Sequence, residues 1–130
     1  MNKRIIDKYQ LAPTWDEKNG GVYVPLLNIT VQSKNLRNAD GEYVNWEEAN
    51  RLAKEAGGRL FTRDEAYILL FQKDDINALL KDHGGDPLED YFWTSSEYDE
   101  AIVWYIFFSS GFVGTSNKFF SGVARAVIAS

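Results

Sequence analysis

The middle of the chain repeats its apolar residues at the spacing of an amphipathic helix. Asn45 can cap the N-terminus of this helix, with Glu48 three residues later, and Gly57-Gly58 can close its C-terminus with a positive φ. The apolar positions in between recur at steps of three and four residues: Trp46, Ala49, Leu52, Ala53 and Ala56. A helix with one face against a core is therefore predicted over residues 45–56.

A second helical pattern begins at Thr62. Thr62 is a suitable N-cap and Glu65 can reach back to it, so the two residues can form a capping box. The apolar stripe of this helix continues through Ala66, Leu69, Leu70, Ile76, Leu79 and Leu80. The charged run Lys73-Asp74-Asp75 predicts an interruption, and the Asp- and Gly-rich residues 82–87 predict a loop.

Strand patterns flank the two helices. Asn19-Gly20-Gly21 marks a turn before strands predicted over residues 22–25 and 26–32, the second of which is rich in β-branched residues. From Tyr91 onward strands are predicted again, with a hairpin turn at residues 109–111 and a final strand over residues 123–128. This order of elements predicts an α+β fold in which two helices pack on an antiparallel sheet.

The segment around residue 105 has large apolar side chains on both faces. Alternation along a strand places Trp104, Ile106 and Phe108 on the face toward the core. The residues of the opposite face are Val103, Tyr105 and Phe107. Aromatic side chains give a large contact area with few rotamers to fix, so we interpret this face as a recognition surface. The alternative is a second small core beneath the N-terminal strands, formed by Phe107, Phe119 and Phe120.

Length and composition are those of one folded domain. The 130 residues are 45% hydrophobic, 15% aromatic and 25% charged, which predicts a single domain over residues 1–130. The net charge of -5 and the scattered Lys and Arg residues argue against nucleic acid as a partner, because phosphate binding needs clustered basic residues. The absence of cysteine excludes disulfides, thiolate zinc sites and cysteine nucleophiles.

The N-terminal segment, residues 1–8, has basic residues but no apolar run of the length that a signal peptide needs. No later stretch is long and apolar enough to span a bilayer, so neither a signal peptide nor membrane insertion is expected. Asn28-Ile29-Thr30 fits the glycosylation pattern, but without a secretory signal we interpret Asn28 as an unmodified strand residue.

Catalytic and metal-binding patterns are weak throughout the sequence. His83 is the only histidine, and Ser95 and Ser96 lack the Gly-x-Ser-x-Gly setting of a hydrolase nucleophile. We therefore expect no catalytic residue, and we interpret both serines as hydroxyls that bond to backbone groups. A hydrolase would instead need one concave pocket that joins His83 to Ser95. The acidic residues of segment 82–90 lack the ligand alternation of a calcium loop, so neither a metal nor a cofactor is expected.

Four motifs together resemble the C-type-lectin-fold domains of bacterial and phage surface proteins, including the variable proteins of diversity-generating retroelements. The resemblance covers about residues 40–130. Its motifs are Trp46-Glu47-Glu48-Ala49, the segment from Gly57 to Glu65, Phe92-Trp93-Thr94-Ser95-Ser96-Glu97, and the segment from Trp104 to Val127. The resemblance implies a compact ligand-binding domain with two helices beside a sheet, whose C-terminal strands and loops display the binding residues.

In retroelement-diversified members, codons rich in adenine are rewritten while framework positions stay fixed. Residues that match the usual framework are Trp104, Ile106, Phe108, Gly111, Val113, Lys118, Arg125 and Val127. The residues between them, each reachable from an Asn codon by changing its adenines, are the predicted ligand-binding residues: Tyr105, Phe107, Ser109, Ser110, Phe112, Gly114, Thr115, Ser116, Asn117, Phe119, Phe120, Ser121 and Gly122. Trp93, Trp104 and Arg125 are expected to be structural, with Arg125 bonded to carbonyl groups or to a carboxylate such as Glu97.

The resemblance also suggests what the domain binds and where it acts. The Glu-Pro-Asn, Gln-Pro-Asp and Trp-Asn-Asp motifs of calcium-dependent sugar-binding lectins are missing, which argues against calcium-mediated sugar binding. The expected partner is a protein or glycan receptor on a cell surface, the expected location is a virion or bacterial cell surface, and an oligomer is left open. The alternative function is an invariant adhesive or structural domain of the same fold, such as those on gut bacteria, with Phe107, Phe112, Phe119 and Phe120 buried in the monomer or in an oligomer interface.

Overall fold

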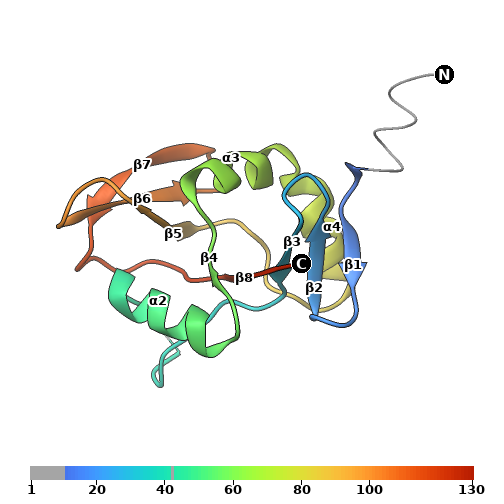
Figure 1. Cartoon of the computed structure of the whole chain (residues 1–130), viewed down its shortest axis with the longest axis horizontal. Helices are drawn as coiled ribbons and strands as arrows, with labels where there is room; N and C mark the ends of the chain where they lie inside the picture. Colours follow the sequence, from blue (N-terminus) through green and yellow to red (C-terminus); the bar gives the residue numbers. More distant parts are fainter. Residues whose placement is uncertain (1–10, 42) are drawn as a thin grey trace.

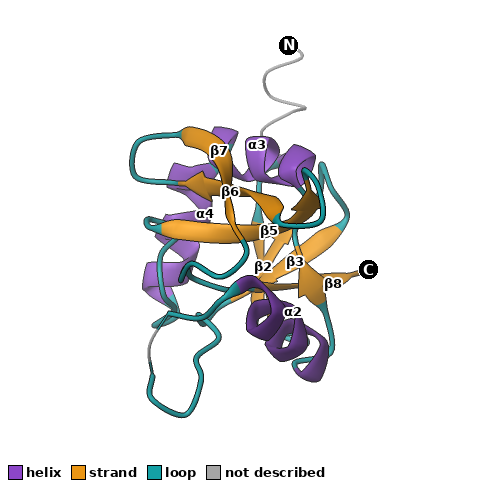
Figure 2. Ribbon diagram, turned by 90° about the vertical axis from the view of Figure 1, so that its left-hand side faces the viewer, coloured by secondary structure: helices purple, strands orange, loops and turns teal. Residues whose placement is uncertain are grey.

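The described residues have an α+β fold (Figures 1 and 2). Together they form two antiparallel sheets and the three helices α2, α3 and α4. The computed structural model describes residues 11–41 and 43–130, so the basic segment of residues 1–8 lies outside the described residues. The α+β class is confirmed, but the predicted pair of helices and single sheet were too few. The extra helix arises from the predicted interruption near residue 73, and the extra sheet arises because the C-terminal hairpin pairs separately from the N-terminal strands.

The first sheet has five strands in the order β1-β2-β3-β8-β4. Their bounds are β1 Thr14–Asp16, β2 Gly21–Val24, β3 Ile29–Gln32, β8 Ala126–Ala129 and β4 Arg59–Leu60. The strand predicted from Leu26 begins only at Ile29, because residues 25–28 form a turn in which Asn28 has a φ of 53°. Asn tolerates this left-handed conformation better than most residues with a side chain.

The second sheet consists of β5 (Tyr91–Glu97), β6 (Ile102–Phe107) and β7 (Phe112–Asn117), in that order. The predicted hairpin turn at residues 109–111 is confirmed, with Gly111 at a φ of 79°. The final strand, predicted from residue 123, begins as regular β8 only at Ala126. Val123 instead joins β5: its amide donates to the carbonyl of Tyr91 at 2.7 Å, and its carbonyl accepts from the amide of Trp93 at 3.0 Å.

The two predicted helices begin where their caps place them. α2 (Trp46–Glu55) starts after Asn45, whose Oδ1 accepts from the amide of Glu48 at 2.9 Å, and Gly57 follows the helix with a φ of 88°. α3 (Arg63–Phe71) starts with the complete capping box of Thr62 and Glu65. α4 (Lys73–Asp82) follows directly, since the helix is interrupted at Gln72, just before the charged run.

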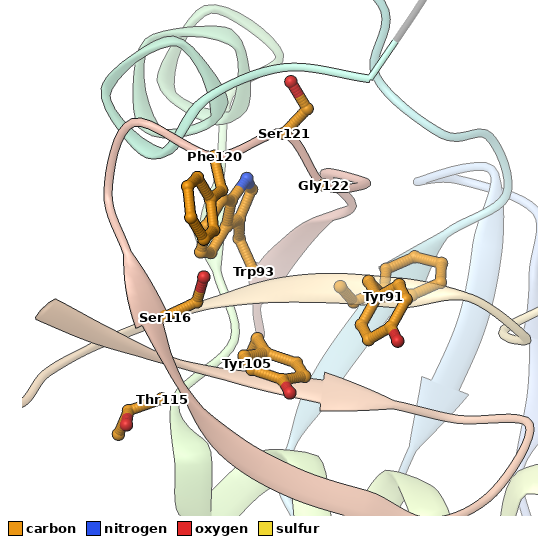
Figure 3. A pocket seen from close by; sticks show the side chains of 9 residues that line it. Tyr91, Trp93, Tyr105, Thr115, Ser116, Phe120, Ser121 and Gly122 are labelled. Carbon is orange, nitrogen blue, oxygen red and sulfur yellow. The ribbon is translucent and has the colours of Figure 1, made fainter.

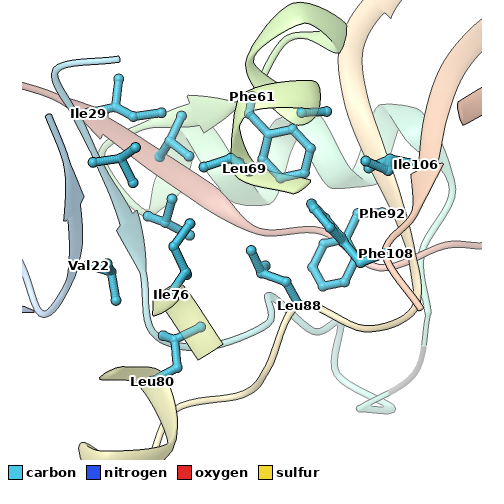
Figure 4. Packing of buried hydrophobic residues seen from close by; sticks show 14 of the residues in the cluster. Val22, Ile29, Phe61, Leu69, Ile76, Leu80, Leu88, Phe92, Ile106 and Phe108 are labelled. Carbon is cyan, nitrogen blue, oxygen red and sulfur yellow. The ribbon is translucent and has the colours of Figure 1, made fainter. Parts of the chain in front are cut away.

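Two clusters of buried side chains form the core. The larger one lies between the first sheet, α3, α4 and one face of the second sheet (Figure 4). Its largest members are Ile29, Phe61, Leu69, Ile76, Leu80, Leu88, Phe92, Ile106 and Phe108. The smaller cluster lies under α2 and contains Val44, Ala49, Ala53, Leu60, Trp93, Val103, Ala124 and Ala126. The apolar stripes predicted for the helices are therefore confirmed as core positions.

Arg125 is fully buried between the two sheets. Its guanidinium donates from Nη1 to the carbonyl of Gln32 at 3.0 Å, and from Nη2 to the carbonyl of Asp86 and to Oδ1 of Asn35, both at 2.6 Å. Burial lowers the pKa of Arg125 to about 10, against the opposing effect of the Asp86 charge. The predicted bonds to carbonyl groups are confirmed, but the alternative partner Glu97 was wrong, since that carboxylate pairs with Lys118.

The capping box of α3 makes a pH-dependent contribution to stability. Burial raises the pKa of Glu65, but hydrogen bonds from Arg59 and from Thr62 outweigh burial and leave this pKa below its ordinary value. The charged form of Glu65 therefore stabilises the fold at neutral pH, and this contribution is lost as the pH falls through the lowered pKa.

We expect Glu65→Gln to lower the free energy of unfolding at pH 7 by about 0.5–1 kcal/mol, because the partly exposed pair with Arg59 is screened by solvent. Below about pH 4 the difference from the wild-type chain should shrink. Urea unfolding at pH 7 and pH 3 measures both values, with Glu47→Gln in the first turn of α2 as a control. An equal loss at both pH values would contradict this account.

Candidate functional site

The second sheet carries a row of aromatic side chains on the face that points away from the larger core. We define the aromatic face by five side chains: Tyr91, Trp93, Tyr105, Phe107 and Phe112. Strand register aligns them across β5, β6 and β7, so they share one side of the sheet. Tyr91 stacks on Phe107 with ring centroids 4.3 Å apart. Tyr105 lies between Tyr91, at 5.4 Å, and Phe112, at 6.1 Å.

The predicted alternation along β6 is confirmed for Tyr105 and Ile106. Ile106 belongs to the larger core cluster, whereas Tyr105 lies on the opposite face. Val103 shares that opposite face but is fully buried, because α2 and the smaller cluster cover this end of the sheet. Trp104, expected in the core, is only half-buried and lies under the guanidinium of Arg63, whose Cζ is 4.7 Å from the ring centroid.

A cleft of about 390 Å³ opens between the aromatic face and the loop of residues 118–122. We call it the aromatic cleft. Figure 3 shows its side chains, which come from β5, β6, β7 and this loop. The residues that line it are Tyr91, Phe92, Trp93, Tyr105, Thr115, Ser116, Phe120, Ser121 and Gly122. Segments that lie far apart in the chain therefore build a single concave site.

Lys118 fixes the loop that forms one wall of the cleft. Its carbonyl accepts from the amide of Trp46 at 3.1 Å, at the start of α2. Its Nζ pairs with Glu97, donates to the carbonyl of Glu100 at 2.8 Å, and lies 4.5 Å from the centroid of the Trp46 ring. A cation over an indole face is attracted by the ring quadrupole. Lys118, which was predicted to be a framework residue, thus anchors the loop.

Gly122 and Trp93 form the inner end of the cleft. Trp93 is buried, and its Nε1 donates to the carbonyl of Val44 at 2.8 Å. Gly122 exchanges two backbone hydrogen bonds with Val44, each 2.9 Å long. A Cβ atom on Gly122 would lie 3.1 Å from Nε1 of Trp93, closer than ordinary side-chain packing allows. Gly122 therefore contributes backbone to the cleft, and a side chain there would press against the buried indole of Trp93.

The cleft has no charged lining residue. Burial, and next the neighbouring Tyr91, raise the pKa of Tyr105, so its hydroxyl stays protonated at neutral pH and can both donate and accept a hydrogen bond. Hydroxyls of Ser116 and Ser121 are also among the lining groups. Apolar ring surfaces beside neutral hydroxyls suit an uncharged group with an apolar face and a few hydrogen-bonding atoms.

Nine of the thirteen predicted ligand-binding residues lie at the cleft or beside it. Six of them line it: Tyr105, Thr115, Ser116, Phe120, Ser121 and Gly122. Phe107 and Phe112 belong to the aromatic face, and Gly114 lies beneath the edge of the Phe112 ring. The exposed fraction of the Phe112 side chain is 57% and that of Phe120 is 64%.

The other four predicted residues lie elsewhere. Ser109 and Ser110 are in the turn between β6 and β7, where Ser109 donates to the carbonyl of Glu89. Asn117 accepts, through Oδ1, from the amide of Phe119 at 2.8 Å and so shapes the next turn. Phe119 is 82% exposed and borders Asn45 and Glu47 instead of the cleft. The alternative of a second small core with Phe119 and Phe120 was wrong.

Three lining residues are not among the predicted binding residues: the buried Phe92 and Trp93, and the exposed Tyr91. Tyr91 begins β5 and pairs in register with Phe107. A usable signal was present, because Tyr91 and Trp93 alternate with the core residue Phe92 and must share a face. Trp93 was expected to be structural, and its buried side chain confirms this, although it also lines the cleft.

The residues considered for catalysis have structural contacts. His83 caps α4 and stacks on Trp15 with ring centroids 3.8 Å apart. The Oγ of Ser96 accepts from the amide of Arg63 at 2.9 Å, as expected for a hydroxyl bonded to backbone. His83 is the C-cap of α4 and Ser96 belongs to β5, and neither residue lines the aromatic cleft.

Carboxylates of the acidic loop before β5 also accept hydrogen bonds from backbone amides. The carboxylate of Asp86 accepts from the amide of Asn35 at 2.9 Å, and that of Asp90 accepts from the amide of Tyr91 at 2.9 Å. Within residues 11–41 and 43–130, no group of three or more His, Cys, Asp or Glu side chains is placed to hold a metal ion. In the same part of the chain, no helix combines the length and the apolar content needed to cross a bilayer.

No protein-family model matches the chain. No curated protein matches it either. The aromatic cleft and its scaffold are therefore the basis on which a function can be assigned.

The contact between Gly122 and Trp93 predicts which glycine of this region resists substitution. Gly122→Ser should lower the free energy of unfolding by about 1–3 kcal/mol, because the indole is held by Val44 and cannot move away. Gly114→Ser is the matched control: its Cβ would meet the exposed ring of Phe112, which can rotate. Thermal unfolding of the two variants compares them, and equal stability would contradict the assigned role of Gly122.

Proposed function

We propose that this chain is a non-enzymatic ligand-binding domain that recognises a receptor through the aromatic face and the aromatic cleft. The observation that carries the proposal is the convergence of six predicted binding residues on one uncharged cleft. Residues at its border stay exposed although they are large and apolar, and exposed apolar clusters mark interaction sites on soluble proteins. A binding role explains why a folded chain keeps Phe112 and Phe120 in contact with solvent.

The preorganised geometry of the site also supports a role in recognition. Tyr91 and Tyr105 are on paired strands, so their backbone is ordered before a ligand arrives and little entropy is lost on binding. Aromatic rings supply contact area with few rotamers, and neighbouring Ser and Thr hydroxyls supply adaptable hydrogen bonds, as in antibody paratopes. The anchor at Lys118 fixes one end of the loop that carries Phe120.

The finer proposal is a C-type-lectin-like domain whose C-terminal region is diversified by a retroelement. It is supported by the α+β architecture and by the separation of roles along residues 104–127. Positions expected to be framework include the buried Arg125, Ile106 and Phe108, whereas the positions between them include the exposed Phe112 and Phe120. Sequencing of the flanking DNA tests diversification. We expect a near-copy of the 3′ end of the gene that differs from it at adenines, beside a reverse transcriptase gene. Absence of both would refute diversification.

The proposed partner is a protein or glycan receptor on a cell surface, and the proposed location is a virion or bacterial cell surface. An uncharged cleft fits a sugar face or a neutral side chain better than a phosphate or a carboxylate. The alternative, an invariant adhesive domain with its phenylalanines buried, requires an oligomer interface, because Phe112, Phe119 and Phe120 are exposed in the single chain.

Single substitutions in the cleft should separate binding from folding. We expect Tyr105→Ala and Phe120→Ala each to weaken binding at least about tenfold, since aromatic anchors dominate binding energy. The chain, displayed on beads, would be screened against bacterial surface proteins and a glycan array. Phe71→Ala is the control, because Phe71 is 83% exposed but belongs to α3, away from the cleft. Unchanged binding by both folded cleft variants would refute the proposed site.

A further inference from the structure

β7 forms one edge of the second sheet. It pairs only with β6, in a continuous antiparallel register from Phe107↔Phe112 to Ile102↔Asn117 without a bulge. Figure 1 and Figure 2 both place β7 at the border of the fold, with no further strand beyond it. One long side of this strand is therefore open among the described residues.

The hydrogen-bond pattern shows which backbone groups face outward. The amide of Lys118, just beyond β7, donates to the carbonyl of Ala101 at 3.0 Å. This bond shows which residues of β7 are hydrogen-bonded to β6. Bonded and non-bonded positions alternate along an antiparallel pair, so the N–H and C=O groups of Val113 and Thr115 point away from β6. Within residues 11–41 and 43–130, no hydrogen bond is made by these four outward groups.

This edge lacks the usual protection against strand pairing. Sheet edges are normally blocked by lysine, proline, a bulge or a covering loop. β7 has the sequence Phe-Val-Gly-Thr-Ser-Asn, with no charge and no proline, although the whole chain has a net charge of -5. Two copies both have a net negative charge, and an uncharged strand edge adds no like-charge repulsion where they would meet.

We propose that two copies of this chain pair through β7, antiparallel and related by a two-fold axis at Gly114. In this register Val113 lies opposite the partner's Thr115, and the two residues exchange N–H···O bonds, as the symmetry-related pair also does. All four outward groups are then satisfied. Gly114 lies on the axis, where the absence of a side chain allows close approach of the two backbones. Lys118 lies opposite the partner's Ser110, so no like charges meet.

The pairing would also complete the aromatic cleft. On the aromatic face, Ser116 lies opposite the partner's Phe112, and Ser116 lines the cleft. Each cleft thus gains an aromatic ring at its border from the other copy, which covers part of the exposed Phe112 side chain. Two clefts lie on one continuous sheet of six strands, three from each copy. This arrangement does not depend on which ligand the cleft takes.

Sedimentation equilibrium of the full chain over a range of concentrations tests the pairing without any ligand. The apparent mass is expected to rise from 14.8 kDa toward twice that value. Thr115→Pro removes only an outward-facing N–H, which an edge strand tolerates, and should weaken dimerisation at least about tenfold. Thr115→Val keeps the N–H and should dimerise like the wild-type chain. A mass of 14.8 kDa at every concentration up to the millimolar range would overturn the proposal.

Amide hydrogen exchange of the wild-type chain locates the interface, and it decides the question if Thr115→Pro fails to fold. The amides of Val113 and Thr115 should become protected as the concentration rises, while those of α3 stay unchanged. A dimer that forms without this protection would overturn the pairing through β7. Protection only when a peptide or protein of different sequence is added would equally overturn self-pairing. Both results leave the proposed recognition function intact, because its test uses cleft variants and a receptor.

Discussion

The buried guanidinium of Arg125 is the interaction on which the arrangement of the two sheets depends. It joins the end of β3 at Gln32, the following loop at Asn35 and the loop before β5 at Asp86. Its Cζ also lies 5.6 Å from the centroid of the Phe92 ring in β5. A buried charge is costly unless its hydrogen bonds are satisfied, so the carbonyl and amide oxygens must stay in position around it. Loss of any one of these acceptors would leave an N–H group of the buried cation without its hydrogen bond.

This constraint explains why one face of the second sheet stays open. Val123, two residues before Arg125, bonds to β5 through both its amide and its carbonyl, and this fixes the orientation of the sheet. Phe92 and Ile106 then face the larger core, and the alternation of strands leaves Tyr91 and Tyr105 on the other side. α2 covers only the end of that face near Val103. The remaining part is the aromatic cleft, so the scaffold and the site have one physical origin.

Patterns between neighbouring residues were sufficient to predict the helix starts and the face of the strand to which each side chain belongs. The caps at Asn45 and Thr62 and the alternation around Tyr105 depend on neighbouring residues, and the structure has them as predicted. The number of sheets and the cleft wall depend on pairings between distant segments, such as Val44 with Gly122, which no local pattern encodes. The sequence therefore predicts Gly122 as a ligand-binding residue, although its backbone packs on Trp93. The resemblance to a known family supplied the proposed role of the C-terminal segment, and periodicity alone would not have done so.

The central claim is that the aromatic cleft is the surface at which a ligand binds. Oxidative footprinting of the chain, free and bound to a receptor that it captures, reports the solvent access of each aromatic side chain. The account predicts that Tyr105 and Phe120 lose reactivity on binding, whereas Phe71 and Tyr67 on α3 keep theirs. Protection of Phe71 and Tyr67 with unchanged reactivity of Tyr105 and Phe120 would contradict it.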